Sequence, residues 1–463
     1  MATILGDGTL QELRETIQGD VIGPGDDQYD SARFAWNGMI DKRPGLIVRC
    51  SGVSDVVAAV QFARSQGMEI AIRGGGHSLP GFSTTDGGLV IDLAGMRGVR
   101  VDETSNRVIV EGGATWADVD QATQQHGLAV TGGLVSSTGV GGFTLGGGVG
   151  WLMRKYGLSS DNLVAAEVVT ADGRLVRASE TENPDLLWGL RGGGGNFGVV
   201  TTLEFRLHQV GPDILGGPIF HPASQTAQVL RGWRSYTSAD LADEMTTLVS
   251  LGSAPPIPPI PEALHGTKVV TVVAGYAGPP DAGVGVAAPL HDLGDPIADL
   301  LGPIPYLVLQ TLVDAGWGPG ARNYFTSAFL RDVPDAAIAI LADYHQSCPS
   351  PFSEIHIHHM GGAVARVGSD QSAFGNREAP YLLNVVARWI EPADDERNLG
   401  WARELRAAME PFGTGGVYSN FLGVGDDRVR AAYDTARYTR LAALKRDWDP
   451  DNVFHLNQNI SPG

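Results

Sequence analysis

The sequence predicts an α+β protein built of two parts, and three observations lead to that expectation. Three glycine-rich loops occur between residues 74 and 198, each beside an apolar segment that is typical of a strand. The chain changes character near Gly211-Pro212, where the apolar segments become longer and the glycine clusters fewer. With 463 residues, 43% of them hydrophobic, the chain is too long for one compact domain and is rich enough in apolar side chains for two cores.

The first part alternates short strands and helices. A strand at Leu46–Cys50 is followed by a helix with Ser54 as N-cap that ends near Gly67, and by a strand at Met68–Ile72. Thr115 and Asp118 are expected to cap a second helix. The other expected elements of this part are strands at 89–93, 108–111 and 199–207 and a hairpin at 164–179, turned by Asp172-Gly173.

The second part has longer elements. Strands are expected at Val269–Tyr276 and Phe352–Met360, and helices at Asp335–Gln346 and Asp394–Glu410. Residues 254–262 contain five prolines, which predicts a stiff extended loop rather than an interaction motif.

The most informative short motif is RGGGHS at residues 73–78, directly after an expected strand. Glycines without side chains adopt positive φ, so their backbone N–H groups can turn inward and approach an anion. His77 would then stand where a phosphate-bearing cofactor lies. The alternative is a tight surface turn that carries an ordinary histidine.

A denser glycine run supports the first alternative. Residues 132–150 read GGLVSSTGVGGFTLGGGVG, and a third cluster, GGGGNFG, occupies residues 192–198. Flexible linkers are also glycine-rich, but Val, Leu and Phe between these glycines would not suit a solvated linker. One extended ligand held at several points, such as a dinucleotide, accounts for all three loops. They do not form a Rossmann fingerprint, because the G-x-G-x-x-G spacing is absent.

The chain resembles the FAD-linked oxidases of the p-cresol methylhydroxylase fold, in the berberine-bridge-enzyme-like branch. The resemblance is carried by RGGGHSLPGFSTTDGGLVIDL at 73–93, VSSTGVGGFTLGGGVGWLMRKYGLSSDNL at 135–163, DLLWGLRGGGGNFGVV at 185–200 and YTRLAALKRDWDPDNVFHLNQNI at 438–460. Among bacterial members it resembles 6-hydroxy-D-nicotine oxidase and polyketide-tailoring flavoproteins. The resemblance implies an FAD-binding domain at 1–211, a substrate domain at 212–415 with an antiparallel sheet covered by helices, and a segment at 416–463 that returns to the FAD-binding domain.

The same resemblance implies that His77 is joined to the 8α-methyl carbon of FAD. Neutral imidazole is a good nucleophile near pH 7. Many relatives add a second bond through a cysteine, but the aligned position here is Val135, and the only cysteines are Cys50 and Cys348. One covalent bond is therefore expected.

Further residues are expected around the cofactor because they fall on matching motifs. Ser136 and Ser137 are expected to support the turn that binds the diphosphate, and Arg377 to bind the pyrophosphate or to form a structural ion pair. The cofactor-binding set comprises Arg73, Gly74, Gly75, Gly76, His77, Ser78, Gly81, Val135, Ser136, Thr138, Gly139, Gly141, Gly142, Thr144, Gly146, Gly148, Gly150, Asn162, Gly198, Val200, Tyr418, Asn420, Asn457 and Asn459.

Catalytic candidates lie on the strand FSEIHIHHM at 352–360. Side chains alternate along a strand, so Ile355 and Ile357 would point one way and Glu354, His356 and His358 the other. The resemblance implies that this sheet covers the flavin ring, with His356 the best match to the base of related enzymes. The alternative is a solvent-facing polar strand. Metal binding by these histidines is disfavoured because no further ligand has suitable spacing.

Two other segments are expected to serve catalysis. Tyr418 and Asn420 in GGVYSNF would share one face of a strand beside the flavin, where Tyr418 would orient or deprotonate the substrate. The alternative is a core tyrosine with a satisfied hydroxyl. Thr138 occupies the position that controls oxygen access in relatives, and its small side chain predicts O₂ as the electron acceptor.

The expected activity is hydride transfer from a small-molecule alcohol, hemiacetal or amine to FAD, with O₂ reduced to H₂O₂. A tailoring oxygenase or dehydrogenase and a flavin-binding protein without turnover are the alternatives. The net charge of −19 argues against nucleic-acid and anionic-membrane partners. With no apolar run of about 18 residues and no signal-like N-terminus, a cytoplasmic location is expected.

Overall fold

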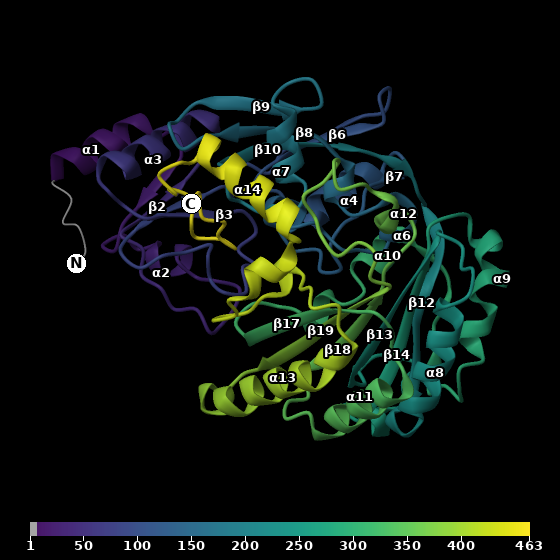
Figure 1. Cartoon of the computed structure of the whole chain (residues 1–463). Coiled ribbons are helices and arrows are strands. Elements are labelled where there is room, and N and C mark those ends of the chain that lie inside the picture. The colour runs from purple at the N-terminus through teal and green to yellow at the C-terminus, as the bar shows by residue number, and fades with distance from the viewer. Residues whose placement is uncertain (1–6) are drawn as a thin grey trace.

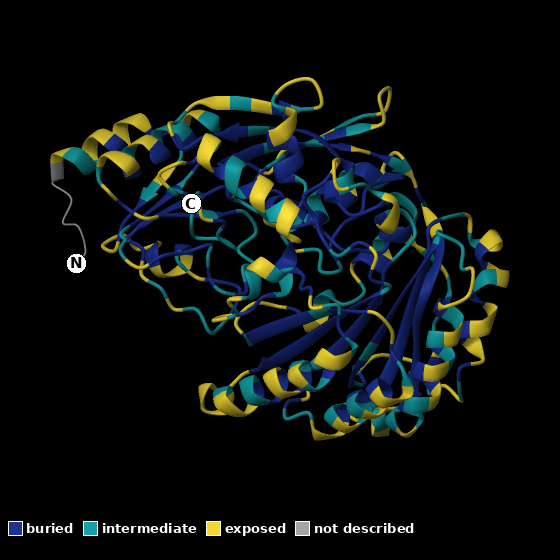
Figure 2. Ribbon diagram, viewed as in Figure 1, coloured by how far each residue is buried: buried dark blue, intermediate teal, exposed yellow. Residues whose placement is uncertain are grey.

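The computed structural model describes residues 7–463, which form an α+β fold in two lobes (Figure 1). One lobe holds the N-terminal elements together with the last helix, and the other holds one large sheet with helices packed along it. Most strands are buried, whereas the outer faces of the helices are exposed (Figure 2). The expected fold class is confirmed.

A four-stranded sheet in the order β1-β2-β4-β3 carries the first glycine loop. Strand β4 is parallel to β2 and β3, and each of its side chains is buried, which suits its three apolar residues at 89–91. Strand β3 ends at Arg73, so the loop at 74–78 begins at the carboxyl end of the sheet. The strands are β1 (Asp20–Ile22), β2 (Leu46–Arg49), β3 (Ile70–Arg73) and β4 (Leu89–Asp92).

Helix α3 (Val53–Ser65) joins β2 to β3, and its start differs from the expectation. The N-cap is Gly52 rather than Ser54. The carboxylate of Asp55 accepts hydrogen bonds from the backbone N–H groups of Ser51, Gln18 and Gly19, so it stabilises the turn before the helix instead of leaving that role to Ser54.

A second, antiparallel sheet of five strands lies beside the first, in the order β5-β6-β10-β8-β9. The expected hairpin is confirmed as the antiparallel pair β8–β9. The capping box of Thr115 and Asp118 is also confirmed, at the start of α4 (Trp116–Gln124). The strands are β5 (Val99–Asp102), β6 (Arg107–Glu111), β8 (Leu163–Val169), β9 (Leu175–Ser179) and β10 (Val199–Arg206).

The large sheet of the second lobe is antiparallel, in the order β15-β12-β14-β13-β18-β19-β17, with β16 paired to β12. Four helices cover one face (Figure 1), where Ile355, Ile357 and Trp233 belong to a single apolar core. The strands are β12 (Asp213–Pro222), β13 (Met245–Ser253), β14 (Lys268–Tyr276), β15 (Ala298–Asp299), β16 (Gly302–Pro305), β17 (Arg322–Leu330), β18 (Glu354–His359) and β19 (Tyr381–Trp389); the helices are α8 (Thr226–Thr237), α9 (Pro280–His291), α11 (Asp335–Ser347) and α13 (Asp395–Met409).

Shorter elements connect these layers. The proline-rich segment at 254–262 forms turns without a regular strand, as expected of a loop. Within residues 7–463, no helix has both the length and the apolarity needed to cross a membrane. The remaining helices and strands are α1 (Asp7–Thr16), α2 (Tyr29–Ala32), α5 (Val140–Leu145), α6 (Met153–Tyr156), α7 (Pro184–Leu190), α10 (Tyr306–Gln310), α12 (Ala363–Arg366), β7 (Leu128–Ala129) and β11 (His208–Gln209).

The C-terminal segment packs on the first lobe through α14 (Thr435–Trp448). Leu441 and Leu444 join the same apolar core as Phe197. The fully buried Lys445 donates hydrogen bonds to the backbone carbonyls of Asn196 (2.7 Å) and Phe454 (2.9 Å) and to the carboxylate of Asp449 (2.7 Å). One ammonium group thus links the tail to the third glycine loop.

We expect Lys445→Met to destabilise the protein by about 3–5 kcal/mol, because the carboxylate of Asp449 stays buried without its charged partner. The measurement is urea unfolding followed by circular dichroism. Arg231→Ala is the matched control, since its ion pair with Asp335 is exposed and should contribute at most about 1 kcal/mol. Equal midpoints for the two variants would contradict the assigned role of Lys445.

Candidate cofactor and substrate site

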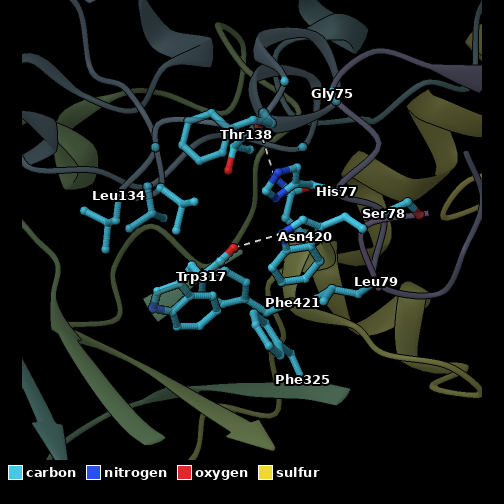
Figure 3. Close-up of a pocket in the computed structure, with 18 of the residues that line it drawn as sticks. Gly75, His77, Ser78, Leu79, Leu134, Thr138, Trp317, Phe325, Asn420 and Phe421 are labelled. Atoms are coloured by element: carbon cyan, nitrogen blue, oxygen red, sulfur yellow. Dashed lines mark hydrogen bonds between the residues drawn. The ribbon is translucent and has the colours of Figure 1, made fainter. Parts of the chain in front are cut away.

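A cavity of about 590 Å³ lies between the glycine loops and the inner face of the large sheet. Figure 3 draws part of its lining, with His77 and Thr138 on the side of the glycine loops and Trp317, Phe325 and Phe421 on the side of the sheet. Its volume is within the range of about 300–1,000 Å³ for sites that bind organic molecules. All three glycine loops contribute to its walls.

The loop at 74–78 presents free backbone donors to this cavity. Gly76 has a φ of 73°, which favours glycine. Within residues 7–463, the N–H groups of Gly75, Gly76, His77 and Ser78 donate no hydrogen bond. Backbone N–H groups are rarely left without an acceptor, so these donors fit a ligand that carries oxygen acceptors.

The first two glycine loops touch each other through their backbones. A Cβ atom on Gly75 would collide with the backbone nitrogen of Gly139, and a Cβ on Gly139 would collide with that of Gly75. Glycine at positions 75 and 139 is therefore a steric requirement. The second loop is also tied to the other lobe, because the backbone N–H (2.9 Å) and hydroxyl (2.5 Å) of Ser136 both donate to Asp314.

His77 is held between two neighbours. Its Nε2 lies 3.1 Å from the hydroxyl of Ser137, and its ring stacks on Trp36 with centroids 4.7 Å apart. Burial lowers the pKa of His77 to about 4. The imidazole is therefore neutral, and so nucleophilic, at physiological pH.

The inner face of the large sheet places a polar row over the cavity. Thr271, Ser250, His356 and Asn384 stand directly opposite one another on β14, β13, β18 and β19, and all four line the cavity. Glu354 and His358 line it as well, whereas Ile355 and Ile357 are in the core on the other side. The alternation expected for this strand is confirmed.

Glu354 and His356 form a close pair, with Oε2 and Nε2 2.5 Å apart. Burial raises the pKa of Glu354, but hydrogen bonds from His356 and Ser250 and the charge of Arg388 outweigh it, and the net pKa lies below its usual value. The carboxylate of Glu354 therefore stays ionised beside the ring of His356.

Two further polar atoms of this face are available to a ligand. Burial, with a smaller contribution from the charge of His356, lowers the pKa of His358 to about 3, so its ring is neutral. In the part of the chain that the structure describes, neither His358 Nε2 nor Asn384 Oδ1 has a hydrogen-bond partner, although both residues are buried. A substrate with a polar hydrogen would satisfy such atoms.

Aromatic side chains close one end of the cavity. The rings of Trp36 and Trp317 are parallel within 5°, and Arg388 lies against both, 5.7 and 5.4 Å from their centroids. Phe325 packs edge-on against Trp317. Sequence reasoning missed these residues and Asn384. The signals were a lone amide in the apolar run YLLNVVARW and a tryptophan within the glycine-rich GWGPG.

Most residues expected at the cofactor line this cavity. From the expected set, the cavity wall includes Gly74, Gly75, Gly76, His77, Ser78, Val135, Thr138, Gly139, Gly141, Gly142, Gly146, Gly198, Val200, Asn420 and Asn457, together with Glu354, His356 and His358. The residues that do not line it are Arg73, Gly81, Ser136, Thr144, Gly148, Gly150, Asn162, Tyr418 and Asn459.

Tyr418 differs from its expected role. Residues Ser419–Phe421 form a 3-10 turn rather than a strand, so Tyr418 and Asn420 do not alternate as expected. The buried hydroxyl of Tyr418 accepts hydrogen bonds from the backbone of Gly148 and from Asn420 Nδ2, both at 2.9 Å. Burial raises its pKa to about 12. Tyr418 is therefore a core residue that orients Asn420, not a base facing the substrate.

Other expected cofactor contacts are structural. Arg73 pairs with Asp92 at 2.9 Å, and Arg377 pairs with Asp161 at 2.6 Å, and all four side chains are buried. The structural alternative for Arg377 is thus the one observed. Asn162 donates to the backbone carbonyls of residues 156 and 158 and so stabilises a turn.

Several glycines of the expected set do not line the cavity and are instead required by close packing. A Cβ on Gly81 would collide with Ile40, one on Gly148 with Ser159, and one on Gly150 with the carbonyl of Gly132. Thr144 is fully buried, and the half-buried Asn459 lies outside the wall. These residues shape the loops that carry the wall.

Other proteins are similar to this chain in sequence and in fold. Residues 44–179 match the family model described as FAD binding domain, and residues 407–461 match the one described as berberine and berberine like. (R)-6-hydroxynicotine oxidase from Paenarthrobacter nicotinovorans is 33% identical over 96% of this chain and 97% of its own length. The crystal structure of 6-hydroxy-D-nicotine oxidase from Arthrobacter nicotinovorans gives a TM-score of 0.86 at 31% identity, covering 96% and 98% of the two chains.

A more distant structure shares the fold. Glucooligosaccharide oxidase from Acremonium strictum gives a TM-score of 0.86 at 23% identity, covering 98% of this chain and 99% of that one, and its FAD is described as 6-S-cysteinyl, 8α-N1-histidyl. Fold, cavity and relatives together define an FAD-dependent oxidoreductase. The chain belongs to the berberine-bridge-enzyme-like family of FAD-linked oxidoreductases.

The hydrogen-bond donors and the open space of the cavity wall both suit FAD. Free N–H donors at 75–78 suit phosphate and flavin oxygens. At Gly142 and Gly195, both in the wall, a Cβ would meet no atom within 4 Å and would stand in space that the cavity leaves open. Because these two glycines have no side chain, they leave room for a flat cofactor to lie against the backbone.

We expect Gly142→Ala to lower the flavin content of the purified protein, because the added methyl group enters the cavity. The fold should not suffer, since Ala is better than Gly in a helix by about 0.5–1 kcal/mol. Gly285→Ala is the matched control, because Gly285 is also helical with free space for a Cβ but lies on the exposed helix α9. Flavin absorbance per protein is the measurement, and equal content in both variants would contradict the assignment of Gly142 to the cofactor wall.

Proposed function

We propose that this protein is an oxidase that carries FAD on one covalent bond through His77. The observation that carries the proposal is the shared cavity, whose walls include His77 on one side and the Glu354–His356 pair on the other. The histidyl linkage described for the glucooligosaccharide oxidase supports the use of a histidine. Val135 stands where a second, cysteinyl bond would require a thiol.

FAD bound in the cavity would supply the redox chemistry, namely hydride acceptance from a substrate C–H and two-electron reduction of O₂ to H₂O₂. The glycine loops would hold the cofactor with their N–H groups, and His77 would fix it in place. Asn457, whose Oδ1 has no partner in residues 7–463, is available for a further hydrogen bond to it.

The chain's own part in the reaction is to bind the substrate and to move a proton. His356 would accept the proton from the substrate's O–H or N–H group, and the ionised Glu354 would stabilise the imidazolium that forms. His358 and Asn384 would orient the substrate through their free polar atoms. The aromatic end of the cavity suits a flat or apolar portion of a small molecule.

Thr138 would control how O₂ reaches the cofactor. Its side chain is small and lines the cavity from the second glycine loop, beside His77 and Val135. A small residue leaves space for O₂, which supports an oxidase rather than a dehydrogenase.

Two measurements on the purified protein test this function. We expect acid precipitation to give a yellow pellet whose protein mass is increased by one FAD, and His77→Ala to lose that mass because no other thiol or imidazole replaces the bond. Steady H₂O₂ release is expected with at least one member of a panel of alcohols, phenols and amines. A colourless pellet would refute the covalent bond, and silence with the whole panel would favour flavin binding without turnover.

We expect His356→Gln to slow flavin reduction by the best substrate about 10²–10⁴-fold, because the proton acceptor is removed. Covalent flavin content should stay the same, since His356 lies on the sheet and not on the glycine loops. His221→Gln is the control, because His221 is another buried histidine of the same sheet that does not line the cavity. Stopped-flow absorbance gives the rate of flavin reduction in both variants, and an unchanged rate in His356→Gln would show that another residue is the base.

A further inference from the structure

Residues 306–317 form a segment of the second lobe that is hydrogen-bonded to the first lobe. The segment begins with α10, and its second half lines the cavity. In its middle, Asp314 accepts two hydrogen bonds from Ser136, and at its end the carbonyl of Trp317 accepts one from Nε1 of Trp36 at 3.1 Å. The position of this cavity wall therefore depends on polar contacts between the lobes.

A third contact of this segment joins α10 to α4 in the interior. Nε2 of Gln310 donates a hydrogen bond to Oδ2 of Asp120 at 2.8 Å, and both residues are 1% exposed. Gln310 also lies against the start of the second glycine loop, because a Cβ on Gly132 would come within 2.9 Å of Nε2. The pair thus lies where α4, residues 306–317 and the second glycine loop meet.

The remaining oxygen of each partner has no donor. Within residues 7–463, neither Oδ1 of Asp120 nor Oε1 of Gln310 has a hydrogen-bond partner, although both atoms are shielded from solvent. An ionised carboxyl group only accepts hydrogen bonds, and so does an amide oxygen. An ionised Asp120 would therefore leave two acceptors unsatisfied in the interior, one of them charged, which is strongly unfavourable.

One proton removes both deficits. A neutral carboxylic acid has an O–H donor as well as an acceptor oxygen. A proton on Oδ1 of Asp120 gives Oε1 of Gln310 a donor, while Oδ2 keeps the N–H bond from the amide. The acid and the amide then hold each other through two hydrogen bonds instead of one.

The other buried aspartates of residues 7–463 are stabilised as anions. Asp55 accepts four hydrogen bonds, three of them from backbone N–H groups. Asp92 and Asp449 each pair with a buried cation. Asp120 has a single neutral donor and no cation, so it is the buried aspartate whose surroundings suit the un-ionised acid.

The electrostatic surroundings act in the same direction. Burial raises the pKa of Asp120 to about 7; the hydrogen bond from the amide opposes this rise, and the charge of Asp314 adds to it. Tyr306 on α10 is the other titratable neighbour, and burial raises its pKa well above the usual value, so the phenol is neutral. Strand β5, which also packs on α4, carries Arg100 and Asp102, but neither contributes to the pKa of Asp120.

We propose that Asp120 is held as an un-ionised acid whose proton completes the pair with Gln310, and that this pair positions residues 306–317 against the first lobe. When the proton passes to solvent, a second negative charge arises near Asp314 and Oε1 of Gln310 loses its donor, so the contact loosens. The cavity wall then loses one of three polar contacts. This inference concerns the wall and depends neither on the covalent flavin bond nor on the reaction proposed above.

The effect of pH on this contact has a fixed direction. An open form, in which the contact is broken and Asp120 meets water, would titrate near the ordinary aspartate pKa of about 4. The closed form holds the proton up to about pH 7. The closed form is therefore favoured most at low pH, and the advantage is lost as the pH rises through about 7. Between about pH 6 and about pH 9, linkage gives a loss of about ten-fold in the closing equilibrium.

Infrared spectra of the purified holoenzyme test the protonation state. The difference spectrum of wild type minus Asp120→Asn isolates the C=O stretch of a protonated carboxyl group at this position. We expect the band at about pH 6 and its loss by about pH 9. Asp55→Asn is the matched control, because Asp55 is also buried but has four donors, and its difference spectrum should contain no such band. Titration of the wild-type band alone gives the same answer if a variant does not fold.

Hydrogen exchange of the same holoenzyme tests the cavity wall. Exchange in peptides from residues 306–317, corrected for the intrinsic effect of pH, should rise about ten-fold in the wild type from about pH 6 to about pH 9. Peptides from α11 are the internal reference. Asp120→Asn keeps a donor and an acceptor for Gln310 at every pH, so it should show no such rise. Absence of the infrared band at about pH 6 would overturn the un-ionised state of Asp120, and an equal rise in both proteins would overturn its control of the wall.

Discussion

The backbone contact between Gly75 and Gly139 is the constraint on which the site depends. Neither position has room for a Cβ, so two loops that are more than 60 residues apart in the chain come together as bare backbone. This contact brings Ser137 to His77 and aligns one wall of the cavity. It also places residues 75–78, whose N–H groups donate no hydrogen bond within residues 7–463, in the same cavity wall as the second loop.

The two walls of the cavity offer a ligand different kinds of interaction. The glycine-loop wall offers backbone donors and open space, and it suits a large flat cofactor. The sheet wall offers titratable side chains at fixed cross-strand positions, and neighbours on four strands set their separation. A rigid sheet backed by a continuous apolar core keeps Glu354 and His356 paired at 2.5 Å, which a loop would not.

Patterns that depend on local chemistry could be predicted from the sequence. The alternation of EIHIH gave the correct face for each side chain, and Thr115 with Asp118 gave a correct cap, because both depend on neighbouring residues alone. For Tyr418 the sequence left a catalytic and a core role open and could not decide between them, because the hydroxyl is satisfied by Gly148, 270 positions away. Trp36 was missed for the same reason, since its contacts with Trp317 and His77 depend on how the lobes meet. Arg377 matched a motif, but Asp161, its partner, lies in a distant segment.

The cavity draws its walls from almost the whole length of the polypeptide, from Trp36 to Gln458. During synthesis on a ribosome, the loop around His77 emerges early, but Asn457 and the buried ammonium of Lys445 that secures the tail emerge last. A nascent chain therefore has no complete enclosure for FAD. Complete enclosure of the cofactor therefore waits for this segment, and a product truncated before Lys445 would lack the hydrogen bond that ties the segment to the third glycine loop.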